Sequence, residues 1–161
     1  MITQEYLKQL FDYQDGQLIR KVCRSRLGKA EEAVGNFDKK SGYYRTSLKG
    51  KTYLLHRLIF LYHNGYTPEF IDHIDGDSTN NKIENLRPAT KKENCRNRTA
   101  HKNNSSGFKN VSWHKKHEKW SVSIYVESKK KHFGYFEDIE LADLVAQEAR
   151  NKFYGQFARH F

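Results

Sequence analysis

Residues 71–98 read IDHIDGDSTNNKIENLRPATKKENCRNR. Short apolar runs flank a long polar stretch, so we expect a short strand at residues 70–74, a polar loop, and a second strand at residues 83–87. Thr90 and Glu93 have the spacing of a capping box, which is typical of the first turn of a helix. The pattern therefore predicts a strand, a loop, a strand and a helix, in that order.

Three side chains of this stretch, those of Asp72, His73 and Asn94, suit the hydrolysis of a phosphodiester. The carboxylate of Asp72 is an oxygen ligand for a hard cation such as Mg²⁺. His73 points to the opposite face of the same strand, where its imidazole could deprotonate a water molecule. The amide oxygen of Asn94 could complete the protein ligands of the metal, which would stabilise the leaving oxygen. The alternative for so short a pattern is an ordinary turn, with Asp72 as a cap and His73 as a structural residue.

The same stretch resembles the HNH endonuclease motif, in the phage homing-endonuclease subgroup that has Asn at the third position. The resemblance is carried by His56-Arg57, Asp72-His73, Asp75-Gly76-Asp77, Asn80-Asn81, Ile83-Glu84-Asn85-Leu86-Arg87, Ala89-Thr90, Asn94 and Asn97. It implies a ββα-metal nuclease module at residues 55–98.

The resemblance also implies a role for each motif residue. His73 is the general base, Asp72 and Asn94 hold the divalent metal, and Asn85 braces the loop between the strands and helps to orient His73. Asn at the third position removes one imidazole ligand, so we expect Mg²⁺ or Mn²⁺ in place of Zn²⁺. His56 precedes an apolar helix, and two roles are open for it: packing or capping, and contact with a phosphate or the active site.

Residues 1–54 are predicted to form a small β-rich segment. Thr3 can act as the N-cap of a short helix, and Asp15-Gly16 marks a turn. From residue 43 the chain alternates with a period of two, interrupted at Lys49-Gly50-Lys51, which predicts a hairpin.

Residues 99–106 are predicted as a polar linker and residues 107–161 as a separate domain. Asp138 can begin a helix there, and Gly155 can end it. Three strands precede this helix, at residues 108–113, 120–126 and 131–136. An antiparallel sheet packed on one helix is the economical arrangement of these elements.

This domain resembles the plant APETALA2-type DNA-binding domain, in the form fused to phage HNH nucleases. The resemblance is carried by SGFKNVSW at residues 106–113, Lys119-Trp120, FGYF at residues 133–136 and the helix containing Ala142. It implies that the sheet lies in the major groove of DNA and that the helix backs it. Where the plant family has several groove-reading Arg residues, this chain has Lys109, Ser112 and His114. The residues expected to bind DNA are Lys109, Ser112, His114, Lys119, Tyr125, Lys130 and His132.

The charge of the chain is strongly basic, with 29 Lys and Arg against 19 Asp and Glu, a formal net charge of +10. Residues 99–131 have 8 basic and 2 acidic residues, and residues 1–55 have 11 and 6. Such a balance favours a polyanion, so we expect double-stranded DNA as the partner. With no apolar run of membrane-spanning length and only 2 Cys, we expect a cytoplasmic protein (host cytoplasm if phage-encoded) without membrane contact or a small-molecule cofactor.

We therefore predict an α+β chain with a β-rich N-terminal segment, a ββα-metal core and a C-terminal three-stranded antiparallel sheet packed on one helix. Its predicted function is that of a metal-dependent, homing-type DNA endonuclease. A single module cuts one strand, so a monomer should nick. Two alternatives stay open: a DNA-binding regulator with a decayed nuclease core, and a nuclease or binder directed at RNA.

Overall fold

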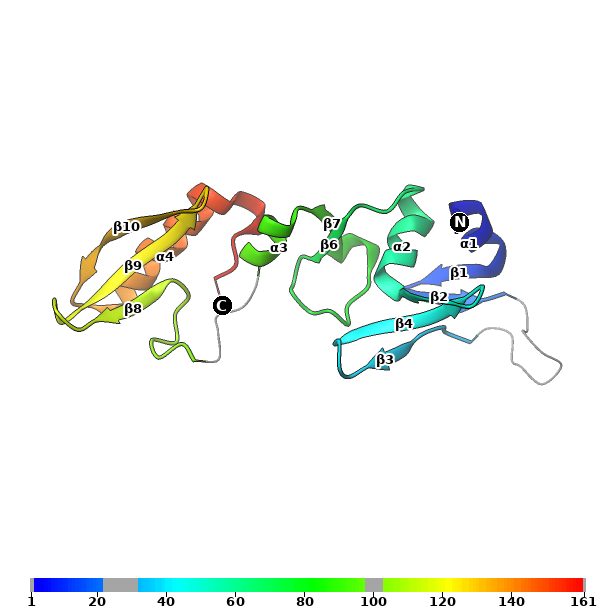
Figure 1. Cartoon of the computed structure of the whole chain (residues 1–161), viewed down its shortest axis with the longest axis horizontal. Coiled ribbons are helices and arrows are strands. Elements are labelled where there is room, and N and C mark those ends of the chain that lie inside the picture. Colours follow the sequence, from blue (N-terminus) through cyan, green and yellow to red (C-terminus); the bar gives the residue numbers. More distant parts are fainter. Residues whose placement is uncertain (1, 22–31, 98–102, 161) are drawn as a thin grey trace. The chain divides into compact units, whose positions relative to one another are not determined.

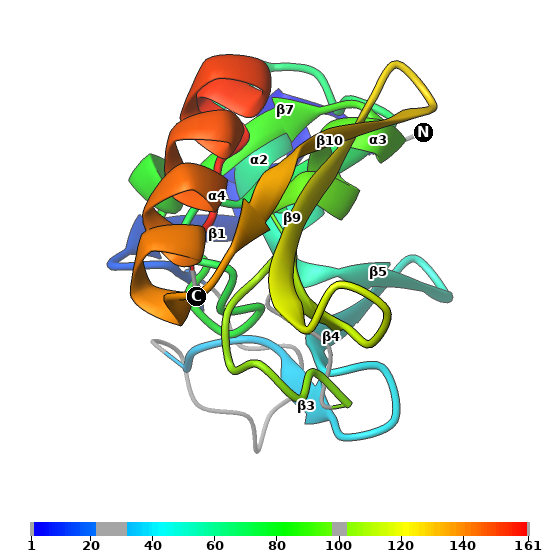
Figure 2. The same ribbon diagram turned by 90° about the vertical axis from the view of Figure 1, so that its left-hand side faces the viewer.

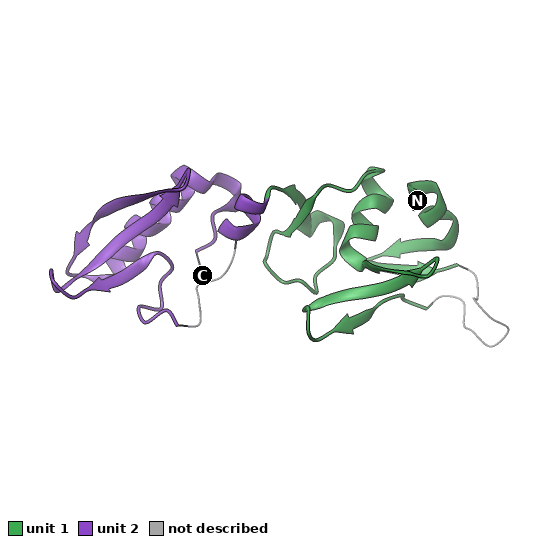
Figure 3. Cartoon of the chain, viewed as in Figure 1, with its two compact units in different colours: residues 1–90 green, residues 91–161 purple. Residues whose placement is uncertain are grey.

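Four helices and four small antiparallel sheets make up the part of the chain that the structure describes (Figure 1). The structure is a computed structural model, and it describes residues 2–21, 32–97 and 103–160. Part of the predicted linker, residues 99–102, lies outside the described residues. The chain forms two compact units, residues 1–90 and residues 91–161 (Figure 3).

The first unit begins with a capped helix and a hairpin. Helix α1 (Gln4–Leu10) is capped by the predicted residue Thr3, whose Oγ1 accepts a hydrogen bond from the Tyr6 amide at 3.2 Å. Strands β1 (Phe11–Gln14) and β2 (Gln17–Arg20) pair through the predicted turn at Asp15-Gly16. Both turn residues have positive φ, which a tight hairpin turn requires.

A second sheet leads into the helix that follows it. It contains three strands in the order β3-β4-β5: β3 (Asn36–Asp38), β4 (Tyr43–Leu48) and β5 (Lys51–Leu54). Pairing of β4 with β5 confirms the predicted hairpin. Helix α2 (Leu55–Asn64) then ends at Gly65, which adopts the left-handed conformation.

One hydrophobic core joins these elements to the hairpin of the predicted nuclease module. Its ten buried members are Leu7, Phe11, Leu18, Leu48, Leu55, Leu58, Ile59, Phe60, Ile71 and Leu86. Residues before position 55 and residues after it therefore pack against each other within the first unit.

The predicted strand–loop–strand pattern is present, with one correction. Strand β6 (Phe70–His73) pairs with β7 (Leu86–Ala89), and helix α3 (Lys91–Arg96) follows. The second strand was expected at residues 83–87, but the 3₁₀ helix η1 (Ile83–Asn85) occupies its first half. Hydrogen bonds explain the difference, because the Asn85 amide donates to the Lys82 carbonyl and so is unavailable for pairing with β6.

The second unit contains, after α3, the predicted three strands and the helix that follows them. Strands β8 (Val111–His114), β9 (Lys119–Val126) and β10 (Lys129–Phe136) pair in the order β10-β9-β8. Helix α4 (Ile139–Tyr154) packs on one face of this sheet, followed by η2 (Gly155–Phe157) (Figure 2). Asp138 caps α4 as predicted, with its Oδ1 accepting bonds from two backbone amides.

Strand β8 begins three residues later than the expected start at residue 108. The hydroxyl of Ser106 donates to the carbonyls of Phe108 and Val111, and Asn110 has a φ of +68°. These contacts fold residues 106–110 into turns, so pairing starts only at Val111.

No helix among the described residues is long and apolar enough to span a membrane.

Arg150 of α4 fastens these turns to the helix from inside the second unit. Its side chain is fully buried, and its guanidinium donates to the Lys109 carbonyl and contacts Asn110 Oδ1 at 3.5 Å. It also forms an ion pair with Asp143 at 3.6 Å, too long for a hydrogen bond. Replacing one partner of a buried ion pair leaves the other charge unpaired in the interior, which is strongly destabilising.

We therefore expect Arg150→Met to lower the unfolding free energy of the second unit by about 3 kcal/mol. Urea unfolding followed by tryptophan fluorescence measures this unit selectively, because both tryptophans, Trp113 and Trp120, lie in it. Lys152→Met, at an exposed position of the same helix, is the control and should change the midpoint little. Equal midpoints for the two variants would show that Arg150 does not stabilise the unit.

Candidate active site

Strand β6 carries Asp72 and His73 on neighbouring positions, so their side chains leave opposite faces of the strand. Both are buried, with 3% and 6% of their surface exposed. They keep these places because β6 pairs with β7 in a defined register, Asp72 opposite Arg87 and His73 opposite Leu86. The sequence placed both residues correctly at the end of a strand.

Asp72 forms an ion pair with its cross-strand neighbour. Both Nε and the NH2 nitrogen of Arg87 donate to the Oδ2 atom of Asp72, at 2.8 and 2.6 Å. Charge-assisted bonds of this kind hold a carboxylate in a fixed orientation. Arg87 belongs to the motif quoted above, but the sequence did not predict that it forms an ion pair with Asp72.

His73 is held by a residue that the sequence did not single out. Its Nε2 atom lies 3.1 Å from Oδ1 of Asn81, which is itself buried with 4% of its surface exposed. Asn81 sits in the polar loop between β6 and η1, eight residues from His73. A loop asparagine gives no local signal of a contact with a distant ring, and the resemblance had assigned the orienting of His73 to Asn85 instead.

Asn85, expected to brace the loop, forms three hydrogen bonds within it. Its Nδ2 donates to Asp75 Oδ1 at 2.9 Å and to the Asn80 carbonyl at 2.8 Å, and its Oδ1 accepts from the Asp75 amide at 3.0 Å. Asp75 also accepts a bond from Asn80 Nδ2 at 2.6 Å. These bonds lower the pKa of Asp75 despite the opposing effect of burial, which is the largest single influence.

The N-terminal hairpin supports the same loop from the other side. The hydroxyl of Tyr13 accepts a hydrogen bond from the Ile83 amide at 3.0 Å. A Cβ atom on Gly16 would lie 2.9 Å from the Lys82 nitrogen and 3.1 Å from the Asn81 carbonyl carbon, so only glycine permits this approach. The turn at Asp15-Gly16 was predicted, but its contact with the loop was not.

His56, at the start of α2, lies beside His73. The ring centroids of the two histidines are 5.1 Å apart and the planes meet at 76°, while the ring of Tyr43 lies 5.2 Å from His56. His56 is buried, with 6% of its surface exposed. Burial lowers its pKa to about 3, and electrostatic repulsion from His73 and Arg57 acts in the same direction. His56 is therefore neutral at the pH at which enzymes are usually assayed.

The side chains present suit an oxygen-preferring cation with few protein ligands. Two residues were expected to hold the metal. Asp72, on β6 in the first unit, has a carboxylate, and Asn94, on α3 in the second unit, has a side-chain amide oxygen. Among residues 2–21, 32–97 and 103–160, no group of three or more His, Cys, Asp or Glu could hold a metal ion. Mg²⁺ in proteins typically takes one or two carboxylates and completes its shell with water and phosphate oxygens.

Six of the seven residues expected to bind DNA share one face of the sheet in the second unit. The register places His114 opposite Lys119, and Tyr125 opposite Lys130. Residues that face each other on paired strands, and alternate residues along a strand, lie on the same side. The full set on this face is Ser112, His114, Lys119, Tyr125, Lys130 and His132. The opposite face contributes Val111 and Val122 to the core under α4.

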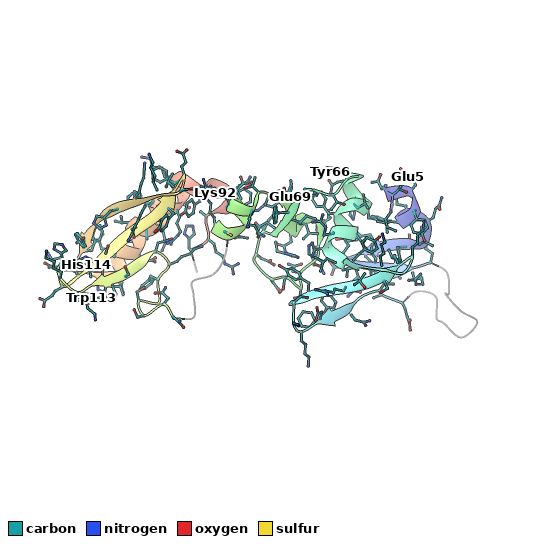
Figure 4. All side chains as sticks on the ribbon, viewed as in Figure 1. Glu5, Tyr66, Glu69, Lys92, Trp113 and His114 are labelled. Carbon is teal, nitrogen blue, oxygen red and sulfur yellow. The ribbon has the colours of Figure 1, made fainter. Side chains whose placement is uncertain are left out.

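Aromatic rings gather on the same face of the sheet. Tyr135 lies between three histidines, with ring centroids 5.0 Å from His114, 4.4 Å from His117 and 4.5 Å from His132. Figure 4 shows His114 at this end of the sheet, and its neighbour Trp113 belongs to the opposite face, where its ring lies 5.0 Å from that of Trp120. His117 and Tyr135 were not among the residues expected to bind DNA; His117 lies in the turn between β8 and β9, and Tyr135 lies in β10.

Lys109, the seventh expected residue, lies apart from this face. Its Nζ donates to the Arg96 carbonyl at 2.7 Å, and it lines a cavity of about 540 Å³ together with Lys91, Lys92 and Tyr154. Burial lowers the pKa of Lys109 to about 8, and the nearby charges of Arg150 and Arg159 act in the same direction. Its cationic side chain therefore lies in a basic hollow rather than on the sheet.

Comparison with known proteins agrees with the motif. The HNH endonuclease family matches residues 53–96, from β5 to α3. Protein 3.8 of Escherichia phage T7 is 39% identical over 98 residues, which cover 60% of this chain and 80% of that protein. No solved structure matches the chain. On this identity and coverage, the chain belongs to the same family as T7 Protein 3.8 and contains an HNH endonuclease domain at residues 53–96.

Proposed function

We propose that this protein is a metal-dependent endonuclease that hydrolyses phosphodiester bonds of double-stranded DNA and cuts one strand per module. The observation that carries the proposal is the buried pair Asp72 and His73 inside the HNH domain, with His73 hydrogen-bonded to Asn81. Adjacent positions of one strand thus provide a carboxylate that can bind a metal, that of Asp72, and an imidazole that can accept a proton, that of His73.

His73 would act as the general base. The side-chain oxygen Oδ1 of Asn81 faces Nε2 of His73, so this hydrogen bond requires a proton on Nε2. The other ring nitrogen, Nδ1, is then the one that takes a proton from water. The Asn81 bond thus selects the tautomer and fixes the ring. Asn85 would serve indirectly, because its three bonds hold the loop that carries Asn81.

Asp72 and Asn94 would hold a Mg²⁺ or Mn²⁺ ion, in the ββα-metal arrangement that the order β6, β7 and α3 supports. When bound, the ion would supply positive charge to the reacting phosphate and the leaving oxygen. Arg87 orients the Asp72 carboxylate through its two bonds to Oδ2. The remaining coordination positions suit water and phosphate oxygens.

The second unit would bind duplex DNA as an APETALA2-type domain. The support is its sheet of three strands backed by one helix, and an outer face that carries Lys119, Lys130 and a group of His and Tyr rings. Lysine side chains there can neutralise phosphates, while Tyr125 and His132 can reach base edges. A homing-type enzyme that nicks as a monomer in the host cytoplasm is the form of activity we infer, with the phage relative as support.

We expect His73→Ala to abolish the conversion of supercoiled plasmid to open circles in the presence of Mg²⁺. Loss of a general base typically lowers the rate about 10²–10⁴-fold. DNA affinity in a mobility-shift assay should stay near that of the unchanged protein, because phosphate contacts elsewhere supply binding. Added imidazole should restore part of the rate, and His63→Ala, at an exposed position of α2, is the control.

A plasmid left intact by the unchanged protein would favour the regulator with a decayed nuclease core. Competition by single-stranded RNA that exceeds competition by duplex DNA would favour the RNA-directed alternative. Nicking by His73→Ala at the rate of the unchanged protein would remove His73 from the chemistry.

Asp72→Asn and Asn94→Ala should each move the Mg²⁺ activation curve to higher concentration, by about tenfold or more, because the first removes the negative charge of a metal ligand and the second removes a ligand. Asp72→Asn keeps the shape of the side chain but leaves the largely buried charge of Arg87 without its carboxylate, so the melting temperature of this variant is measured alongside its activation curve. Cys95→Ser is the matched control, since Cys95 is the exposed neighbour of Asn94 on α3. Activation curves that coincide with that of the unchanged protein would place the metal elsewhere.

Lys130→Ala should reduce the dependence of DNA affinity on salt. Each neutralised phosphate adds about 0.9 to the slope of log affinity against log salt, so the slope should fall by about one. Lys152→Ala on α4, across the sheet from Lys130, should leave the slope unchanged. Tyr125→Ala should instead change the preference between DNA sequences. An unchanged slope for Lys130→Ala would show that this face does not contact DNA.

A further inference from the structure

His56 is buried but has no hydrogen-bond partner. Only 6% of its surface is exposed, and among the described residues no hydrogen bond or ion pair engages either ring nitrogen. Its contacts are with the rings of Tyr43 and His73. Buried polar groups in folded proteins nearly always have a partner, and an exception calls for a specific explanation.

The nitrogens of His56 are not sealed inside the core. The buried polar atoms without a partner, within the part of the chain that is described, are Asp143 Oδ1 and an Arg150 guanidinium nitrogen, both in the second unit. His56 is absent from this group, so its polar atoms still meet solvent. A partner from outside the chain can therefore reach them.

The surroundings of His56 indicate the chemistry of that partner. The ring lies 5.1 Å from that of His73, the proposed general base, and so borders the position of the reacting phosphate. With its pKa near 3, the ring is neutral and carries one N–H donor. An N–H donor suits an anionic oxygen, and charge on the phosphate oxygens grows as the bond breaks.

We propose that His56 is a second substrate-contacting residue, which donates a hydrogen bond to a non-bridging oxygen of the scissile phosphate. The proposal rests on the nuclease function proposed above. It assigns His73 and His56 different tasks: His73 takes a proton from water, and His56 stabilises charge without exchanging a proton. Arg57, next in the chain, does not share this task, because its guanidinium donates to the carbonyls of Pro68 and Glu69.

Two substitutions separate this role from packing. His56→Phe keeps a ring against Tyr43 and His73 but removes the N–H, whereas His56→Gln loses the ring and keeps an N–H donor. In single-turnover nicking of a duplex oligonucleotide, His56→Phe should be slower by about 10²–10³-fold. It should keep the DNA affinity and the melting temperature of the unchanged protein. His56→Gln should retain more of the rate than His56→Phe. The opposite order of rates, with His56→Phe the faster, would mean that His56 only packs.

Sulfur substitution at the nick site tests the contact itself. A single phosphorothioate of defined stereochemistry replaces one non-bridging oxygen with sulfur, which is a weaker hydrogen-bond acceptor. One stereoisomer should slow the unchanged protein and have little further effect on His56→Phe, because the contact is already lost. The proposal falls if the two effects multiply for both stereoisomers, or if neither stereoisomer slows the unchanged protein. Failure of the unchanged protein to nick the all-oxygen duplex would instead overturn the proposed function.

Discussion

The hydrogen bond between His73 and Asn81 depends on a loop that has almost no regular backbone pairing of its own. Side chains replace that pairing: Asn85 and Asn80 bind Asp75, and Asp77 accepts from the Thr79 amide. Most of this loop is exposed, so these bonds act by fixing its shape and not by satisfying buried groups. The density of asparagine and aspartate here is therefore a requirement of the loop shape, and the orientation of His73 follows from it.

Most secondary-structure elements could be predicted from short-range patterns in the sequence. The caps at Thr3 and Asp138, the hairpin at residues 43–54 and the strand that carries Asp72 all follow from residue preferences within a few positions. The strand expected at residue 83 failed, because contacts from Lys82 and Tyr13 hold that segment as a 3₁₀ turn. Tyr13 lies 70 residues away in the sequence, and no local pattern reports such a contact.

The candidate site divides in the same way. Asp72 and His73 were identified from adjacency on a strand and from the nuclease motif. The ion pair with Arg87, the bond from Asn81 and the closeness of His56 depend on strand register and on the packing of α2, which appear only in three dimensions. The face expected to bind DNA was also predicted only in part. The alternation of residues along the strands placed six residues correctly on one side of the sheet, but Lys109 lies in the turns before β8 and contacts the Arg96 carbonyl instead.

The shared core of the first unit limits how the nuclease domain can be transferred between proteins. Four of its ten buried residues, Leu7, Phe11, Leu18 and Leu48, lie outside the family-matched residues 53–96. A chain cut to the matched stretch would expose the apolar surface that these four cover, and Gly16 would no longer support the loop. The transferable part is thus larger than the recognisable motif, because a gene fusion that preserves only the motif would leave part of this core without its covering side chains.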